Sequence, residues 1–207
     1  MKPSISPPLF ASAPEACYTI PPGVHDESRR TILNPATGEE VSFNQYGYET
    51  GGEYTEALVT CVPGGGPPLH FHLTYAERFE AIEGELEVQL NDQPPRSIKP
   101  GESVDVPIRT PHRFSAGEKG AKFKGFVLPA NEGFEQSLYI LFGLARDGQV
   151  GNDGLPKSLI HTAVVGHLGG MSFPGASGAV LNVITSTLAT YARWSGVQDA
   201  LIRKYWA

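Results

Sequence analysis

Short runs of alternating apolar and polar residues fill much of the chain before residue 130. The clearest is residues 85–90, where Leu86, Val88 and Leu90 alternate with polar side chains. Successive side chains of a strand point to opposite faces, so this pattern predicts a strand with one buried and one solvated face. Similar patterns predict further strands over residues 31–33, 40–43, 54–62, 70–73, 78–83, 96–98, 103–106, 112–115 and 122–128. About ten short strands separated by turns predict a mainly β domain, of the jelly-roll or small-barrel type.

Glycine and proline support this division into short strands. The chain has 24 Gly and 18 Pro, which gather between the apolar runs where turns are expected. Residues 34–38, with the sequence NPATG, join the first two strands in a predicted hairpin. In residues 1–30, the prolines favour an extended arm with little helix.

A helical period replaces the alternation after residue 130. Four apolar residues at helical spacing predict a helix over residues 134–145. Apolar residues at the same spacing predict a long amphipathic helix over residues 180–206, which Gly196 would interrupt. The chain is therefore expected to consist of a Pro-rich arm (residues 1–30), a β-barrel (residues 31–130) and a helical tail (residues 131–207).

Residues 158–192 contain no Asp, Glu, Lys or Arg, which raises the question of membrane contact. Glycines and prolines interrupt the stretch, and polar residues dilute its second half, so no window predicts a convincing membrane span. Helices packed on the barrel or buried in a dimer interface are the favoured interpretation, and we expect a homodimer. Membrane contact through residues 158–192 is the less favoured alternative.

Three histidines and one glutamate have the spacing of metal ligands. His70 and His72 are two residues apart, so in an extended segment both imidazoles point to the same face. Glu77 follows a short turn, after which an antiparallel strand would aim its carboxylate back at them. His112 lies beyond two further turns and could close the site from a neighbouring strand. Such a set suits one divalent ion of Fe, Mn, Ni, Cu or Zn and leaves one or two coordination positions open.

At these residues the chain resembles the cupin superfamily. The first cupin motif, Gly, five residues, His-x-His, three or four residues, Glu, six residues and Gly, fits Gly64, His70, His72, Glu77 and Gly84. The second motif fits Gly101, Pro107 and His112. The resemblance covers roughly residues 50–130, and the rest resembles single-barrel cupins that carry a helical tail. It implies a mainly β fold, a cupin-type jelly-roll barrel with a C-terminal α-helical extension.

Two positions depart from the second motif. Arg109 stands where a second Gly is usual, and Ala116 stands where Asn is usual. A left-handed conformation at Arg109 would cost about 1 kcal/mol, so the turn before His112 is the uncertain feature rather than the ligand. Paired histidines can also be plain core residues. The presence of Glu77 and His112 favours a metal, because an ion neutralises the buried carboxylate and satisfies the ring nitrogens.

A redox-active metal with open positions can bind an oxygenated organic substrate and bring O₂ to it. The resemblance supports this chemistry, because cupins with three His and one Glu include dioxygenases of flavonols and β-diketones. We therefore expect a dioxygenase-like oxidoreductase that acts on a small oxygenated substrate chelated to the metal, with Glu77 as the catalytic base. The alternatives are a non-redox metal-dependent isomerase or lyase, with Tyr75 or Glu77 moving protons, and a non-catalytic small-molecule-binding protein.

Several residues near the ligands are candidates for the wall of a substrate pocket. They are Phe71, Tyr75, Phe79, Arg109 and Phe114. Aromatic residues on barrel strands are also common as plain core, and a loop arginine is commonly solvated.

Composition excludes some partners and compartments. A net charge of −6 without basic clusters argues against nucleic acid as a partner. Cys17 and Cys61 are too few for a disulfide framework, and the N-terminal residues lack the continuous apolar run of a signal peptide. We therefore expect a cytoplasmic protein, with His25, His161 and His167 as structural or surface residues.

Overall fold

A computed structural model describes residues 18–207, and most of the predicted N-terminal arm (residues 1–17) lies outside the described residues. The described part begins with a short helix α1 (Pro22–His25) and a 3₁₀ turn η1 (Glu27–Arg30). The described end of the predicted arm thus contains one short helical turn and one 3₁₀ turn. Proline at the first helical position lacks only an N–H that would have no partner there, so Pro22 does not oppose the helix.

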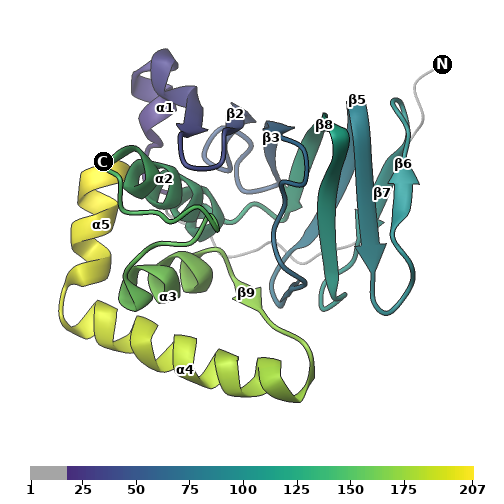
Figure 1. Cartoon of the computed structure of the whole chain (residues 1–207). Helices are drawn as coiled ribbons and strands as arrows, with labels where there is room; N and C mark the ends of the chain where they lie inside the picture. The colour runs from purple at the N-terminus through teal and green to yellow at the C-terminus, as the bar shows by residue number, and fades with distance from the viewer. Residues whose placement is uncertain (1–17) are drawn as a thin grey trace.

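The β part is a seven-stranded antiparallel sheet that curves into a barrel (Figure 1). Its path runs β1-β2-β3-β8-β5-β6, and β7 also pairs with β5. The strands are β1 (Thr31–Asn34), β2 (Glu39–Gln45), β3 (Thr55–Cys61), β5 (Ala76–Leu90), β6 (Arg96–Ile98), β7 (Ser103–Val106) and β8 (His112–Leu128). A second, two-stranded sheet joins β4 (Phe71–His72) to β9 (Met171–Ser172). The chain is thus mainly β in its barrel, a cupin-type jelly roll with a C-terminal helical extension.

Two long strands form the centre of the barrel. β5 and β8 were each predicted as shorter strands, with breaks near Gly84 and between residues 115 and 122. They are instead continuous, because register shifts between Ala81 and Glu83 and between Gly84 and Leu86 absorb the bend without ending the pairing. Gly84 has φ 77° and Gly120 has φ 74°, backbone angles that glycine adopts at little cost.

The barrel core is apolar and closely packed. Phe79, Leu86, Val88, Ile98 and Phe123 are each at most 3% exposed. Cys61 is buried with them as a free cysteine.

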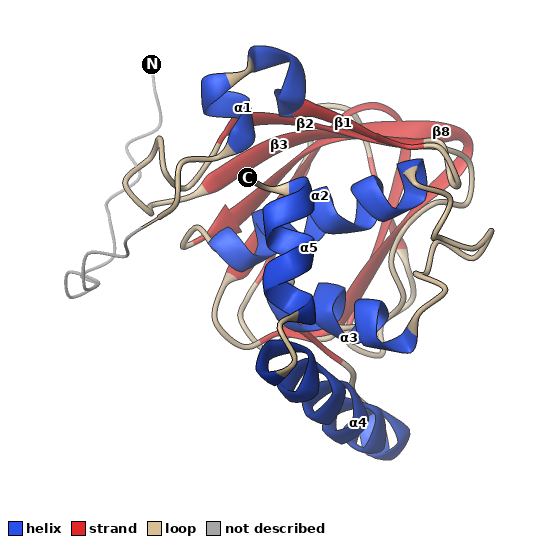
Figure 2. Cartoon of the chain, turned by 90° about the vertical axis from the view of Figure 1, so that its left-hand side faces the viewer, coloured by secondary structure: helices blue, strands red, loops and turns tan. Residues whose placement is uncertain are grey.

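Four helices form the tail and gather on one side of the sheet (Figures 1 and 2). They are α2 (Glu132–Arg146), α3 (Leu159–Leu168), α4 (Gly175–Trp194) and α5 (Val197–Tyr205). The predicted long helix is therefore divided in two, with the expected interruption at Gly196, which has φ 76°. It also begins earlier than predicted, at Gly175.

The tail packs on the barrel through its first helix and its last residues. Tyr139 and Phe142 of α2 join Trp206 in a buried cluster with Val41 and Phe43 of β2. The rings of Phe43 and Tyr139 are stacked, with 5.5 Å between their centroids. Helix α2 lies outside the uncharged stretch of residues 158–192, whose own contact with the barrel side is the pairing of β9 with β4. None of the helices in residues 18–207 has both the length and the apolar composition needed to cross a membrane.

Candidate metal centre

The four predicted ligands converge at one point inside the barrel. One ligand atom from each of His70, His72, Glu77 and His112 lies within 4.8 Å of all the others. His72 is in β4, Glu77 is in β5 and His112 begins β8. His70 precedes β4, and its backbone N–H and carbonyl pair with those of His112 at 2.9 and 2.7 Å. The spacing of two residues puts both histidines of the first motif on the inner face, as the sequence predicted.

Each imidazole is oriented by a hydrogen bond from its outer nitrogen. The Nδ1 atoms of His70, His72 and His112 lie 2.8, 3.2 and 2.9 Å from the carbonyl oxygens of Pro68, Gly170 and Thr110. A carbonyl oxygen can only accept, so each Nδ1 carries the proton. In the neutral rings every Nε2 is then a free lone pair, the form in which histidine binds a metal.

The carboxylate of Glu77 faces these lone pairs. Its Oε2 lies 2.7 Å from His112 Nε2 and 3.3 Å from His72 Nε2. Glu77 is 8% exposed. Burial on its own raises the pKa of a carboxyl group, but hydrogen bonds from His112 and His72, when a proton is present on their Nε2 atoms, outweigh it and hold the pKa of Glu77 at about 2. The glutamate is thus ionised at neutral pH.

His70 is the imidazole that burial keeps neutral most clearly. Burial, reinforced by the neighbouring rings of His112 and His72, lowers the pKa of His70 to about 4. A neutral ring at physiological pH leaves its Nε2 available for coordination.

The residues fit a divalent cation. Nε2 of His72, Nε2 of His112 and Oε2 of Glu77 are buried and lack a conventional hydrogen-bond partner. Buried polar atoms of this kind are costly unless something satisfies them, and a cation placed among them would satisfy all three at once. His70, His72, Glu77 and His112 would hold it.

The turn before His112 adopts the strained geometry that the sequence suggested. Arg109 has φ 65°, in the left-handed region, and its N–H donates to the carbonyl oxygen of His72 at 2.8 Å. The departure from glycine is thus accommodated, and the turn is tied to the strand that carries a ligand. Ala116, at the other departure, is 4% exposed and belongs to the core.

A cavity of about 1250 Å³ opens from the ligands, and both the barrel and the tail line it. His70, His72 and Glu77 are part of its wall. Apolar side chains form much of the rest, from Phe79, Phe114 and Phe123 in the barrel and from Phe134, Leu138, Leu141, Phe142, Val165, Met171, Phe173 and Leu181 in the tail. No Lys or Arg is found among the lining residues within the described part of the chain.

Two of the five predicted pocket residues line this cavity, namely Phe79 and Phe114. The other three lie outside its wall. Phe71 points to the opposite side of β4 from His72, Tyr75 is buried behind the His72 ring, and Arg109 is exposed on its turn. The tail residues were not predicted as pocket residues, although the helical spacing in residues 134–145 was the one available signal for them.

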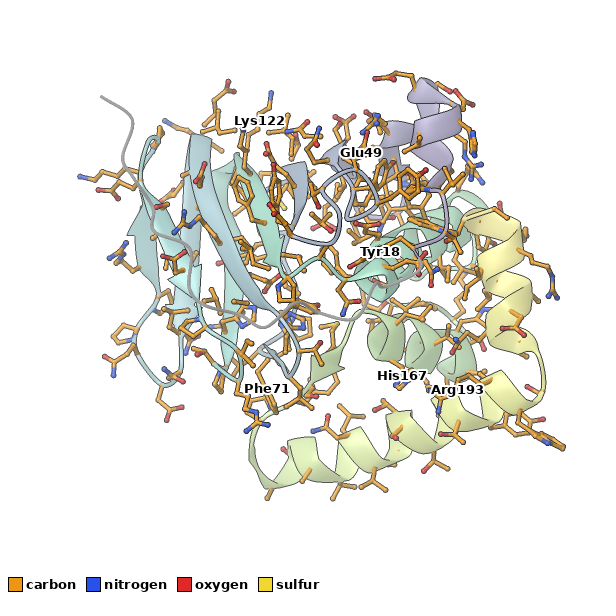
Figure 3. All side chains as sticks on the ribbon, turned by 180° about the vertical axis from the view of Figure 1, so that it is seen from behind. Tyr18, Glu49, Phe71, Lys122, His167 and Arg193 are labelled. Carbon is orange, nitrogen blue, oxygen red and sulfur yellow. The ribbon has the colours of Figure 1, made fainter. Side chains whose placement is uncertain are left out.

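The remaining histidines lie apart from the ligands. His167 and Arg193 meet where α3 and α4 lie side by side (Figure 3), with 2.6 Å between Nε2 and the guanidinium. Burial, followed by the charge of Arg193, lowers the pKa of His167. His161 lies on α3, and His25 is exposed at the end of α1.

Comparison with known proteins gives a match over the barrel. Residues 57–127 match the family model of the cupin domain, Cupin_2. No curated protein sequence matches the chain at a significant level.

Comparison with solved structures finds several of similar fold. An RmlC-like cupin from Shewanella frigidimarina is 20% identical, with 50% of this chain and 86% of that chain covered and a TM-score of 0.43. KdgF from Halomonas sp. is 20% identical, with 44% and 81% covered and a TM-score of 0.40. A variant of oxalate decarboxylase from Bacillus subtilis is 23% identical, with 48% and 27% covered and a TM-score of 0.42. Residues 57–127 are thus a cupin domain, and in this chain the barrel that contains it is followed by helices.

Proposed function

We propose that this protein is a metal-dependent, dioxygenase-like oxidoreductase that uses O₂ on a small oxygenated organic substrate. The observation that carries the proposal is the convergence of ligand atoms from four buried side chains, of which His70, His72 and Glu77 line a large cavity. One divalent ion of Fe, Mn, Ni, Cu or Zn would be held by His70, His72, Glu77 and His112. A redox-active ion with open positions would supply Lewis acidity and electron transfer to O₂.

The composition of the cavity wall supports an apolar substrate. Aromatic and aliphatic side chains from both barrel and tail surround the space, and the lining residues of the described part include no Lys or Arg. A small polyanionic acid would find no Lys or Arg among those lining residues, whereas an aromatic or acyl compound would bury its apolar surface. The substrate class favoured by the site is therefore an aromatic or acyl compound with an oxygen group that can reach the metal.

Glu77 is proposed first as a ligand. A carboxylate with a pKa of about 2 is a weak base, so its role as a general base stays a prediction. Tyr75 gives the isomerase alternative little support, because its hydroxyl donates to the carbonyl oxygen of Gly169 and does not line the cavity. A non-redox lyase or isomerase and a binding protein remain the rival functions.

The test combines metal analysis with O₂ uptake. Purified wild-type protein is compared with a His70→Ala/His112→Ala variant and with a His25→Ala control at an exposed position. We expect near-stoichiometric metal in the wild type and the control, loss of metal in the double variant, and O₂ consumption by the Fe(II)-loaded wild type with aromatic enols or β-diketones. Metal binding with turnover in the absence of O₂ would favour an isomerase or lyase. No metal in any protein, after reconstitution with each candidate ion, would contradict the proposed site.

We also propose that the protein is a homodimer paired through α4. Val180, Ile184, Tyr191 and Trp194 are between 49% and 83% exposed. With Thr187 they follow the 4-3-4-3 spacing of a helix-pairing seam. Helix α4 also projects beyond the rest of the molecule (Figure 2). Residues 175–192 carry no charge, so two copies would meet without repulsion, whereas helices that bind membrane surfaces typically carry Lys or Arg on the polar face.

Sedimentation velocity tests the dimer. Ile184→Asp would place a charge in the seam and is expected to give monomers, while Ala179→Asp, on the same helix but off the seam, should leave the dimer intact. Equal sedimentation of wild type and Ile184→Asp would contradict pairing through α4, and binding of the wild type to lipid vesicles would favour the membrane alternative.

A further inference from the structure

A short segment of the helical tail lies directly against the strand that carries His72. β9 pairs antiparallel with β4, so that Met171 is opposite His72 and Ser172 is opposite Phe71. The tail thus reaches back into the barrel where one of the ligands is held.

His72 differs from the other two histidines in what orients its ring. Nδ1 of His70 and Nδ1 of His112 donate to carbonyl oxygens two residues earlier in their own loops. Nδ1 of His72 donates to Gly170, which is 98 residues away in the tail. The tautomer and the direction of this one ring therefore depend on the tail.

Tyr75 connects the same ring to the same segment. Its ring stacks on His72, with 4.2 Å between centroids and an interplanar angle of 24°. Its hydroxyl donates to the carbonyl oxygen of Gly169 at 2.6 Å, and the side chain is 1% exposed. Tyr75 therefore restrains His72 directly and also holds the turn whose next carbonyl accepts from the His72 Nδ1–H.

The turn itself requires glycine. Gly170 has φ +61°, and a Cβ added there would lie 3.3 Å from Cε1 of Tyr75 and 3.9 Å from Nδ1 of His72. A side chain at this position would be strained and would press on the two rings that the turn positions.

The far end of the segment is fixed to α4. The side-chain amide of Asn182 accepts from the N–H of Phe173 at 2.9 Å and donates to its carbonyl oxygen at 3.0 Å. A Cβ at Gly178 would lie only 2.4 Å from that same carbonyl oxygen, so the helix approaches the segment closely. Residues 169–173, which we name the strap, are thus anchored at one end by Tyr75 and at the other by Asn182.

We propose that the strap and Tyr75 are positioning elements that hold His72 in its metal-binding orientation. The proposal rests on the proposed metal site. Metal affinity then depends on the packing of the tail. If the strap is displaced, the carbonyl oxygen of Gly170 no longer accepts from Nδ1 of His72, and the tautomer of that ring is no longer fixed. Hydrogen bonds of this kind to ligand histidines set both ring direction and basicity.

The first test is Tyr75→Phe in the full chain, which keeps the stacked ring and removes only the hydroxyl. Tyr48→Phe removes the same atom at an exposed tyrosine and serves as the control. After removal of metal, Mn(II) affinity is measured by EPR titration. Loss of one hydrogen bond predicts affinity about 3- to 10-fold weaker for Tyr75→Phe and a changed Mn(II) spectrum. Gly170→Ala should show a larger effect, and Asn182→Leu should act in the same direction from the other end of the strap.

A second measurement separates this proposal from the metal site itself. In metal-free protein at neutral pH, ¹⁵N NMR reports which nitrogen of His72 carries the proton. The wild type and Tyr48→Phe are expected to show the proton on Nδ1, and Gly170→Ala and Tyr75→Phe to show a mixture of tautomers. A wild-type protein that binds no Mn(II) but shows this change would support the strap while contradicting the metal site. An unchanged tautomer together with unchanged affinity in the variants would overturn the proposed role of the strap.

Discussion

His112 Nε2 lies 2.7 Å from Glu77 Oε2, and both atoms are buried. Because Nδ1 of His112 already donates to a carbonyl, neutral His112 presents a lone pair to a carboxylate that also offers only lone pairs. Two acceptors at this distance repel each other unless a proton or a cation lies with them. The pair therefore makes the centre a place where proton and metal compete for the same buried atoms.

Replacement of Glu77 by Gln is expected to abolish most metal binding. The amide keeps the size of the side chain but removes the negative charge that balances the ion. If the free energy of metal binding is shared among four ligands, loss of one weakens affinity by at least about 100-fold. Isothermal titration calorimetry with Mn(II) and Zn(II) measures the metal affinity. Glu80→Gln, on the opposite face of β5, is the control. Wild-type affinity in Glu77→Gln would exclude the glutamate as a ligand.

The stability of the metal-free protein should fall as the pH drops from 6.5 to 4. The pKa of His70 is about 4 in the folded protein, against an ordinary value of 6.5. The unfolded chain therefore takes up a proton in this window while the folded chain does not, so the stabilisation is present above pH 6.5 and is lost as pH falls. A shift of this size corresponds to about 3 kcal/mol.

Urea unfolding of the metal-free protein at several pH values measures this loss. The free energy of unfolding of the wild type and of the exposed His25→Ala control should fall equally as the pH drops. In His70→Leu, which has no group to protonate at this position, it should change less with pH. An equally steep profile in His70→Leu would assign the fall to other groups.

The ligand positions were predictable because they depend on local rules. A spacing of two residues sets the shared direction of His70 and His72, and the motif spacing brings in Glu77 and His112. The continuity of β5 and β8 was not predictable, since Gly84 and Gly120 give the same local signal at a bulge as at a turn.

Contacts between the tail and the barrel were even harder to predict from the sequence. β9 has only two residues, too few for a periodic pattern, and its place beside β4 is fixed by tertiary pairing. In the sequence, the adjacent Gly169 and Gly170 served only as interruptions of the uncharged stretch, which argued against a membrane span. Their role beside His72 and Tyr75 depends on a contact between residues about a hundred positions apart.

Glu135 should produce a pH dependence of the opposite sign. Burial raises the pKa of this carboxyl group to about 7, although Gly47 N–H and the Thr55 hydroxyl donate to it. Below pH 4.5, the ordinary value, both states are protonated and the cost of burial is absent. Between pH 4.5 and 7 the unfolded chain releases this proton while the folded protein keeps it, so about 3 kcal/mol of stability is lost across the window, and the loss is complete above pH 7.

Relative to the wild type, Glu135→Gln is therefore expected to be more stabilising at pH 8 than at pH 5, because the amide resembles the protonated acid. The difference between the variant and the wild type isolates this group from the opposing contribution of His70. Exposed Glu118→Gln should follow the wild type. If Glu135→Gln changes the free energy of unfolding relative to the wild type by the same amount at pH 5 and at pH 8, the carboxyl group does not titrate in this range.

Two motif glycines should differ sharply in their tolerance of alanine. Gly84 and Gly101 both have positive φ, 77° and 88°, so alanine is strained by about 1 kcal/mol at either. At Gly101 no atom lies within 4 Å of an added Cβ, but at Gly84 the Cβ would lie 2.2 Å from the carbonyl oxygen of Gly120 on β8. Backbone cannot move aside as a flexible side chain can, so the bulge that bends the central strand pair would have to open.

Urea unfolding should show a loss of about 1 kcal/mol for Gly101→Ala and about 3 kcal/mol or more for Gly84→Ala. Equal losses would mean that the two strands separate at the bulge without cost, and the close approach of β5 and β8 would then not be what maintains the curvature of the barrel.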